Sequence, residues 1–332
     1  GRGEWRSREP DAPVRGFHLN EIYSPWVRLA EMVATFMASK DSPETLKTFV
    51  NTALAETWEE RGEQDFDLVH LAEDRPEHWG VLPAAAIVVV AGADVQMDRL
   101  EVEIVAWAED GESWSVAYEV IDGDPRIPVS SEFSPWKRLD ELLATDWAHE
   151  SGHHLTVSAC AVDGNYLADE VYAYTKPREH RGVVAVRGAS GEGAPVIKAR
   201  TRNNSAKALI YTLGVDTLKS RMYSRMAIEE PGPGYCHFPM DRGFDYFEQL
   251  LSERAVKRYR RGYPIIEWVK RKGQQRNEPL DCRNYATAAL QIRKPNWSAI
   301  RRRIGAPAVE RSIAPMEQRP PRRRRQISKG IG

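Results

Sequence analysis

One stretch constrains the fold of this chain more than any other, residues 87–107, which read IVVVAGADVQMDRLEVEIVAW. The β-branched run before Asp94 is too apolar for a surface strand, so we expect a strand that is covered on both faces and central in its sheet. Burying an unpaired carboxylate costs several kcal/mol, so Asp94 must lie at the tip of this strand or have a partner. Asp94 is therefore either a structural cap or a metal ligand.

The segments around this stretch predict an α/β fold. Strands are expected over residues 86–95, 99–109 and 113–121, and Asp110-Gly111 is a strong hairpin signal between the last two. Helices over residues 135–150 and 167–176 precede further strands over 155–163 and 182–187. An antiparallel three-strand meander followed by crossover connections predicts a mixed sheet with parallel strands, flanked by helices.

A second apolar strand ends in an aspartate, Asp163, followed by Gly164. If this strand lies parallel to the one that ends at Asp94, both carboxylates emerge at the same edge of the sheet. Adjacent strands are about 4.8 Å apart, so the two side chains can share a divalent cation. With no His or Cys at this edge, Mg²⁺ or Mn²⁺ is the expected ion. The alternative, in which Asp163-Gly164 is a turn and Asp94 a strand end, has equal standing.

A third aspartate, Asp281, lies in the first turn of a helix that is predicted to open at Pro279. A carboxylate here interacts favourably with the helix dipole, which would be a purely structural role. The functional interpretation is a third metal ligand, delivered by a helix that lies across the two strand ends. Glu278 is a possible alternative to Asp281.

Length and composition indicate a globular protein of about two domains. The chain has 332 residues, 42% of them hydrophobic and 29% charged, with a net charge of −1. We predict a helical segment with a linker over residues 1–80, a main domain over 81–295, and a basic, disordered tail over 296–332. The first segment has helices over 24–40 and 42–58 and an irregular linker over 59–83. No apolar run reaches the roughly 20 residues of a membrane span, and three scattered cysteines suit a reducing cytoplasm.

Basic residues are candidates for contacts with a phosphate backbone. Several of them are predicted to end a helix that starts near Phe244, and others follow a strand over residues 263–269. A solvated charged face is the equally weighted alternative. The candidate DNA-binding residues are Lys219, Lys257, Arg258, Arg260, Arg261, Lys270, Arg271 and Lys272.

Short motifs spread along the chain resemble one protein family. They lie at residues 16–26, 49–58, 91–96, 161–166, 213–219, 237–239, 246–250 and 277–286. In their order and spread they resemble the phage terminase large subunit, GpA (lambda-like) family, in its C-terminal nuclease portion. The resemblance implies an RNase H-like fold and a nuclease that cuts concatemeric viral DNA during genome packaging. It also implies a catalytic acidic triad, matched here by Asp94, Asp163 and Asp281, with a two-metal site for Mg²⁺ or Mn²⁺.

The resemblance also carries expectations about partners. It implies double-stranded DNA as substrate, with the terminase small subunit and the portal or procapsid as partners in the host cytoplasm, and no membrane. Residues 16–58 resemble the end of the family's ATPase motor, but the chain has no G-x-x-x-x-G-K-[ST] motif, so we expect a monomeric nuclease without translocation. Two alternatives stay open. One is another RNase H-like nuclease, such as a resolvase or transposase. The other is a non-catalytic DNA-binding or docking module.

Overall fold

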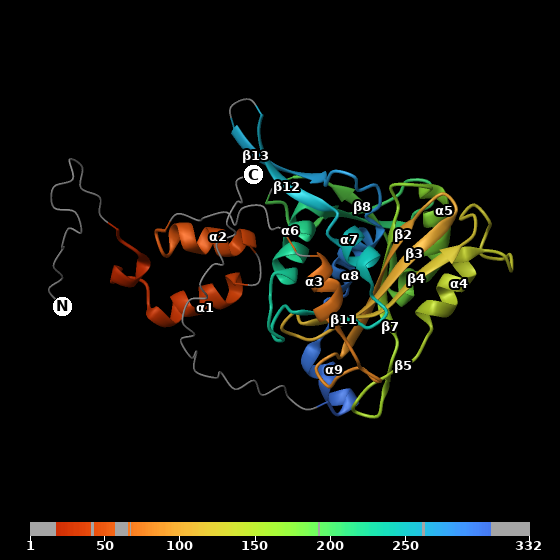
Figure 1. The fold of residues 1–332 in the computed structure, drawn as a ribbon, viewed down its shortest axis with the longest axis horizontal. Coiled ribbons are helices and arrows are strands. Elements are labelled where there is room, and N and C mark those ends of the chain that lie inside the picture. Colours follow the sequence, from red (N-terminus) through yellow and green to blue (C-terminus); the bar gives the residue numbers. More distant parts are fainter. Residues whose placement is uncertain are drawn as a thin grey trace, which may run out of the picture.

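A computed structural model describes residues 18–40, 43–56, 66, 68–191, 193–260 and 263–306 of the chain. The described residues form a nine-stranded sheet with helices on both faces, and a separate hairpin projects from it (Figure 1). In chain order the elements are η1 (Glu21–Tyr23), α1 (Leu29–Ser39), α2 (Pro43–Thr52), α3 (Leu68–Asp74), β1 (Pro76–Glu77), β2 (Val88–Val95), β3 (Arg99–Trp107), β4 (Ser113–Asp122), α4 (Pro135–Leu143), β5 (Trp147–Ala148), β6 (His154–Leu155), β7 (Val157–Asp163), α5 (Ala168–Thr175), η2 (Lys176–Arg181), β8 (Val183–Ala189), β9 (Ile197–Arg202), β10 (Leu209–Gly214), α6 (Val215–Met226), β11 (Cys236–Pro239), α7 (Phe244–Leu250), β12 (Glu253–Arg260), β13 (Tyr263–Lys270), α8 (Glu278–Arg293) and α9 (Trp297–Ile304).

The predicted α/β class is confirmed. The strand order is β1-β11-β4-β3-β2-β7-β8-β10-β9, with β2 in the middle. Strands β2, β3 and β4 pair antiparallel, as the meander predicts, whereas β7 is parallel to both β2 and β8. Every residue of β2 is buried, which agrees with the apolar run in its sequence.

The helices cover the sheet on opposite sides. Gly92 of β2 lies against the backbone of α8, and α8 also contacts β3 and β7. On β7, Cys160 lies near Asp140 of α4 and Tyr174 of α5, so these two helices cover the other face. Consecutive residues of a strand point to opposite faces, and therefore Ala161 and Asp163 share the face that α8 covers.

The N-terminal helices lie to one side of the sheet (Figure 1). Helices α1 and α2 are shorter than the predicted spans and pack on each other through Met32, Phe49 and Ala53. Residues 57–65, which include the predicted end of the second helix, lie outside the described residues. The sequence predicted no regular element over residues 59–83, but α3 and β1 lie there. Strand β1 forms one edge of the sheet, where it pairs parallel with β11, and α3 contacts β1 and α7.

Two further predictions are wrong. The helix expected over residues 135–150 ends at Leu143, because β5 then pairs antiparallel with β6. The basic residues expected at the end of the helix from Phe244 lie in a strand, since α7 ends at Leu250 and β12 pairs with β13 along its whole length. The strand predicted over residues 263–269 is confirmed as β13. Strands β9, β10 and β11 were not predicted.

Candidate active site at the carboxyl end of β2

Asp94 and Asp163 end adjacent parallel strands. Residues 92 and 93 of β2 are in register with Ala161 and Val162 of β7, and the next positions are Asp94 and Asp163. Both carboxylates are buried, with 5% and 6% of their surface exposed. The two strand ends are therefore adjacent, as predicted, and both carboxylates lie on the face that α8 covers.

Helix α8 approaches β2 closely because residue 92 is glycine. A Cβ at Gly92 would lie 2.0 Å from the Cys282 carbonyl oxygen and 2.4 Å from the Ala286 nitrogen. Such contact leaves no room for any side chain at position 92. The first turn of α8 is thereby fixed over the end of β2, and it carries Asp281.

The three aspartates influence one another electrostatically. Burial raises the pKa of Asp94 well above its ordinary value, and the negative charges of Asp281 and Asp163 raise it further. Burial raises the pKa of Asp163 to about 6, although hydrogen bonds from Asn165 and Tyr285 act in the opposite direction. Burial also raises the pKa of Asp281 to about 7, which the positive charge of Lys219 partly offsets. The cluster therefore disfavours three negative charges in the absence of a cation.

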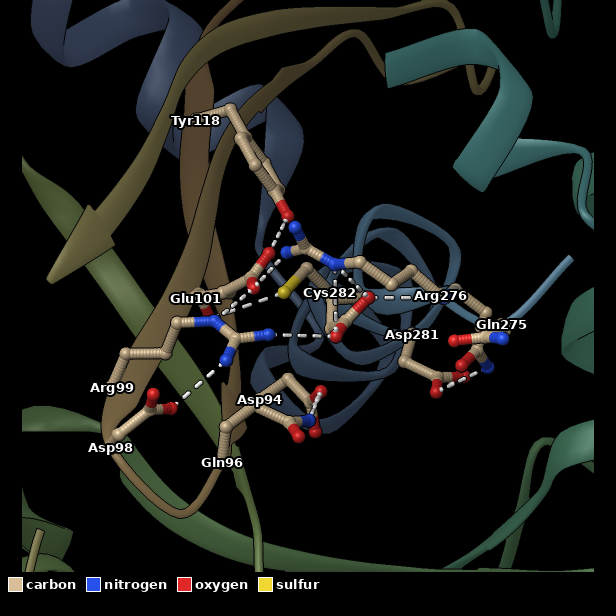
Figure 2. Close-up of polar contacts among 12 residues, drawn as sticks. Asp94, Gln96, Asp98, Arg99, Glu101, Tyr118, Gln275, Arg276, Asp281 and Cys282 are labelled. Carbon is tan, nitrogen blue, oxygen red and sulfur yellow. Dashed lines mark hydrogen bonds and ion pairs between the residues drawn. The ribbon is translucent and has the colours of Figure 1, made fainter. Parts of the chain in front are cut away.

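Each of these carboxylates accepts a hydrogen bond from an amide side chain. Gln96 Nε2 donates to Asp94 at 2.6 Å (Figure 2), and Asn165 Nδ2 donates to Asp163 at 2.9 Å. Asp281 accepts from Asn277 Nδ2 at 2.8 Å. These amide donors are uncharged, so they orient the carboxylates without neutralising them. A bound cation would therefore still lower the electrostatic energy of the cluster.

Glu101 extends this row of acids across the sheet, and the sequence reading missed it. It pairs in register with Asp94 and has no exposed surface. Figure 2 shows its carboxylate between Arg99 and Arg276, each 2.6 Å away, and it also bonds the hydroxyl of Tyr118. Two arginines and a tyrosine satisfy Glu101, which distinguishes it from the aspartates. In the sequence, Glu101 alternates with Leu100 and Val102. This pattern puts Glu101 on the opposite face of the strand from these two residues, and a solvent-facing residue would show the same pattern.

Glu278, the alternative to Asp281, is also compensated. Its carboxylate bonds Arg99 at 2.9 Å and Arg276 at 3.3 Å, and its surface is 6% exposed. Asp98, four residues beyond Asp94, is exposed and pairs with Arg99. Within the described residues, these neighbouring acids thus bond arginines, whereas the three aspartates bond amide side chains.

The donor set fits a hard divalent cation. Carboxylate oxygens are what Mg²⁺ and Mn²⁺ prefer. Burial and neighbouring negative charges raise the pKa of Asp94 and Asp281, and a bound cation would oppose this effect. Among the described residues, however, no three His, Cys, Asp or Glu side chains already converge on one ion position. Ion binding would therefore require the three carboxylates to approach one another more closely.

The candidate DNA-binding residues fall into two groups. Lys219 of α6 is partly buried and pairs with Glu253 at 2.6 Å, so it does not extend toward solvent. Arg258, Lys270 and Lys272 are exposed on or beside the hairpin, and Arg271 is partly buried at its base. Arg261 lies outside the described residues, as do the side chains of Lys257 and Arg260.

A mixed sheet with clustered carboxylates at the end of its central strand, and a helix lying across them, is typical of RNase H-like nucleases. The family described as "Terminase large subunit gpA, endonuclease domain" matches residues 14–303. The chain belongs to this family.

Two relatives are similar in sequence to this chain. The terminase large subunits of Escherichia phage lambda and of Enterobacteria phage P21 are each 31% identical to this chain over 290 residues. Each match covers 85% of this chain but 44% of the relative, so the chain spans less than half the length of these proteins. No solved structure matches the chain significantly. Within the part of the chain that the structure describes, no helix is long and apolar enough to cross a membrane.

Proposed function

We propose that this chain is a metal-dependent endonuclease that cuts double-stranded concatemeric DNA during phage genome packaging. The observation that carries the proposal is that Asp94, Asp163 and Asp281 cluster at the end of β2, with raised pKa values and with amide side chains as their hydrogen-bond partners among the described residues. The family of the chain agrees with this activity. The terminase small subunit and the portal or procapsid are the partners that we propose for it.

In this proposal the aspartates hold two Mg²⁺ or Mn²⁺ ions. Asp94 would be the shared ligand because it stands on the central strand, and Asp163 and Asp281 would each complete one site. A pair of such ions supplies an activated water and charge stabilisation at the leaving 3′ oxygen of a phosphodiester. The protein supplies orientation through Gln96 and Asn165, and α8 shields the site on one side.

A plasmid-cleavage assay with Mn²⁺ tests the proposal. The wild-type chain should nick or linearise plasmid DNA, EDTA should stop it, and Asp94→Ala should not cut while retaining its folded circular dichroism spectrum. Asp98→Asn is the matched control, because this neighbouring carboxylate is exposed and paired with Arg99. Equal cutting by wild type and Asp94→Ala would overturn the proposal. A wild type that binds DNA but never cuts it would favour a docking module instead.

We further propose that the β12–β13 hairpin binds the phosphate backbone. Its sequence is rich in arginine and lysine, and it projects from the sheet (Figure 1). At its base, Glu253 is linked to Asp281 by the side chain of Asn277, which donates to both carboxylates. Log affinity falls as log salt concentration rises, and each phosphate contact that is lost should make this slope less steep by about 0.9. Arg258→Ala, at an exposed position of β12, should show this change. Lys137→Ala, on α4 across the sheet, is the control and should not.

A further inference from the structure

Asn277 occupies the N-cap position of α8, but its side chain does not cap the helix. An asparagine at this position normally accepts a hydrogen bond from a backbone N–H of the first turn. The side chain of Asn277 makes no such bond, whereas Asn296, at the N-cap of α9, accepts from the Ala299 nitrogen at 3.0 Å. The position of Asn277 predicts a helix cap, but its amide must therefore have a different role.

The amide of Asn277 lies between two carboxylates. Its Nδ2 donates to Asp281 Oδ2 at 2.8 Å and to Glu253 Oε1 at 3.2 Å. Only the NH₂ end of the amide can occupy this position, since its oxygen would be repelled from both sides. An amide nitrogen has two hydrogens, and both are used here. Asp281 is thus tied to Glu253 through one side chain.

Glu253 is a rigid anchor for this connection. Its surface is 4% exposed, and its second oxygen accepts from Lys219 Nζ at 2.6 Å. Its backbone nitrogen donates to the Tyr223 hydroxyl at 3.0 Å, and the same hydroxyl donates to its carbonyl oxygen. Lys219 and Tyr223 lie one turn apart on α6, so this helix holds both the main chain and the carboxylate of Glu253.

We propose that Asn277 is a positioning residue that, anchored on Glu253 and Lys219, fixes the carboxylate of Asp281 for metal binding. The proposal rests on the function proposed above. It assigns Lys219 to this network rather than to DNA. Groups that hydrogen-bond a metal ligand set its orientation, and their loss commonly costs about 10–100-fold in metal affinity or activity.

Asn277→Ser separates this role from that of a helix cap. Serine caps a helix N-terminus about as well as asparagine but is too short to join Asp281 to Glu253. We expect Asn277→Ser to retain the thermal midpoint of wild type but to bind Mn²⁺ about 10–100-fold more weakly in calorimetry without DNA. Its plasmid cleavage should need a correspondingly higher Mn²⁺ concentration. Asn296→Ser, the matched control on α9, should change neither Mn²⁺ binding nor cleavage.

The outcomes distinguish this inference from the proposed function. If wild type binds Mn²⁺ and cuts DNA while Asn277→Ser binds Mn²⁺ equally well, the positioning role is overturned and the nuclease stands. If wild type neither binds Mn²⁺ nor cuts, both fail. Adding Glu253→Ala to Asn277→Ser should weaken Mn²⁺ binding less than Glu253→Ala does alone, because the two residues act in series. Fully additive losses would overturn the role of Glu253 as the anchor.

Discussion

Gly92 of β2 lies directly beneath Cys282 of α8, and a Cβ at Gly92 would stand 2.0 Å from the Cys282 carbonyl oxygen. No real Cβ tolerates such a contact with a backbone atom, so a side chain at this position must displace the helix. The same helix carries Asp281 in its first turn. The packing of α8 on the sheet and the geometry of the candidate site therefore both depend on the absence of a side chain at Gly92.

Gly92→Ala should accordingly reduce both stability and cleavage. Overpacking a filled core costs about 1–3 kcal/mol, and here the obstruction is a helix backbone rather than a flexible side chain. Urea unfolding should show this loss, and metal-dependent cutting should fall because Asp281 moves away from Asp94. Gly80→Ala is the control, since nothing lies within 4 Å of a Cβ at that glycine. A Gly92→Ala protein with wild-type stability would contradict the observed packing of α8.

A second prediction concerns the ion pair between Arg283 and Glu103. Arg283 Nη1 lies 2.9 Å from Glu103, and these side chains are 1% and 0% exposed. Arg283→Met should destabilise the protein by about 3–5 kcal/mol, because it leaves a buried carboxylate unpaired. Adding Glu103→Leu should recover much of that loss in the same urea titration. Arg301→Met is the control and should cost at most about 1 kcal/mol, since its partner Glu109 is half exposed.

These two contacts show where sequence reasoning succeeds and where it does not. The apolar run of β2 predicted a central strand, and two strands that end in aspartate predicted the pairing of Asp94 with Asp163. Local patterns suffice for both. Glu103, in contrast, alternates with apolar residues as a solvent-facing position would. Its burial depends on Arg283, which lies far along the chain and could not be assigned to it from spacing.

The basic hairpin was misread for a related physical reason. Cations are favourable at a helix C-terminus, so the arginines after α7 were consistent with a helix end. Strand β12 instead forms because β13 pairs with it from Glu253 to Arg260. Asn277 likewise has the sequence of a helix cap, and only the position of Glu253 shows where its amide points. The missing information in each case is a tertiary partner.

His237 gives a prediction about pH. Burial alone would lower its pKa, but hydrogen bonds to Glu112, at 3.0 Å, and to Glu77, at 2.9 Å, raise it above its ordinary value of 6.5. A group whose folded pKa is raised stabilises the fold fully below its unfolded pKa, and this stabilisation is lost as the pH rises through the folded pKa. Wild type should therefore lose stability above about pH 6.5.

His237→Gln should remove this pH dependence. Glutamine can still bond one carboxylate but carries no titrating charge. The variant should be less stable than wild type at pH 6, by about 1–3 kcal/mol, and the difference should shrink toward pH 9. Unfolding in urea across this range measures it. His154→Gln, at an exposed position in β6, should show no such convergence. A constant difference at all pH values would mean that His237 stabilises β1 only by packing.

Asp163→Asn separates a metal ligand from a structural carboxylate. Burial raises the pKa of Asp163 to about 6, and its charge also raises the pKa of Asp94. Removing this charge should leave the metal-free protein equally stable or more stable by about 1–3 kcal/mol. Mn²⁺ should then stabilise wild type but not the variant, because a ligand stabilises only the state that binds it. In thermal unfolding, the midpoint of the variant should thus be equal to or above that of wild type without Mn²⁺, and below it with Mn²⁺.

Asp216→Ala is the control for this reversal, since Asp216 accepts a hydrogen bond from the Gly191 nitrogen at 2.7 Å and has no place in the proposed metal site. Loss of that charge-assisted bond should destabilise the protein with and without Mn²⁺ alike. If Asp163→Asn behaved in the same way, losing stability in metal-free buffer, Asp163 would be a structural residue. The aspartates would then stabilise the strand ends, and cutting of DNA would have to depend on other groups.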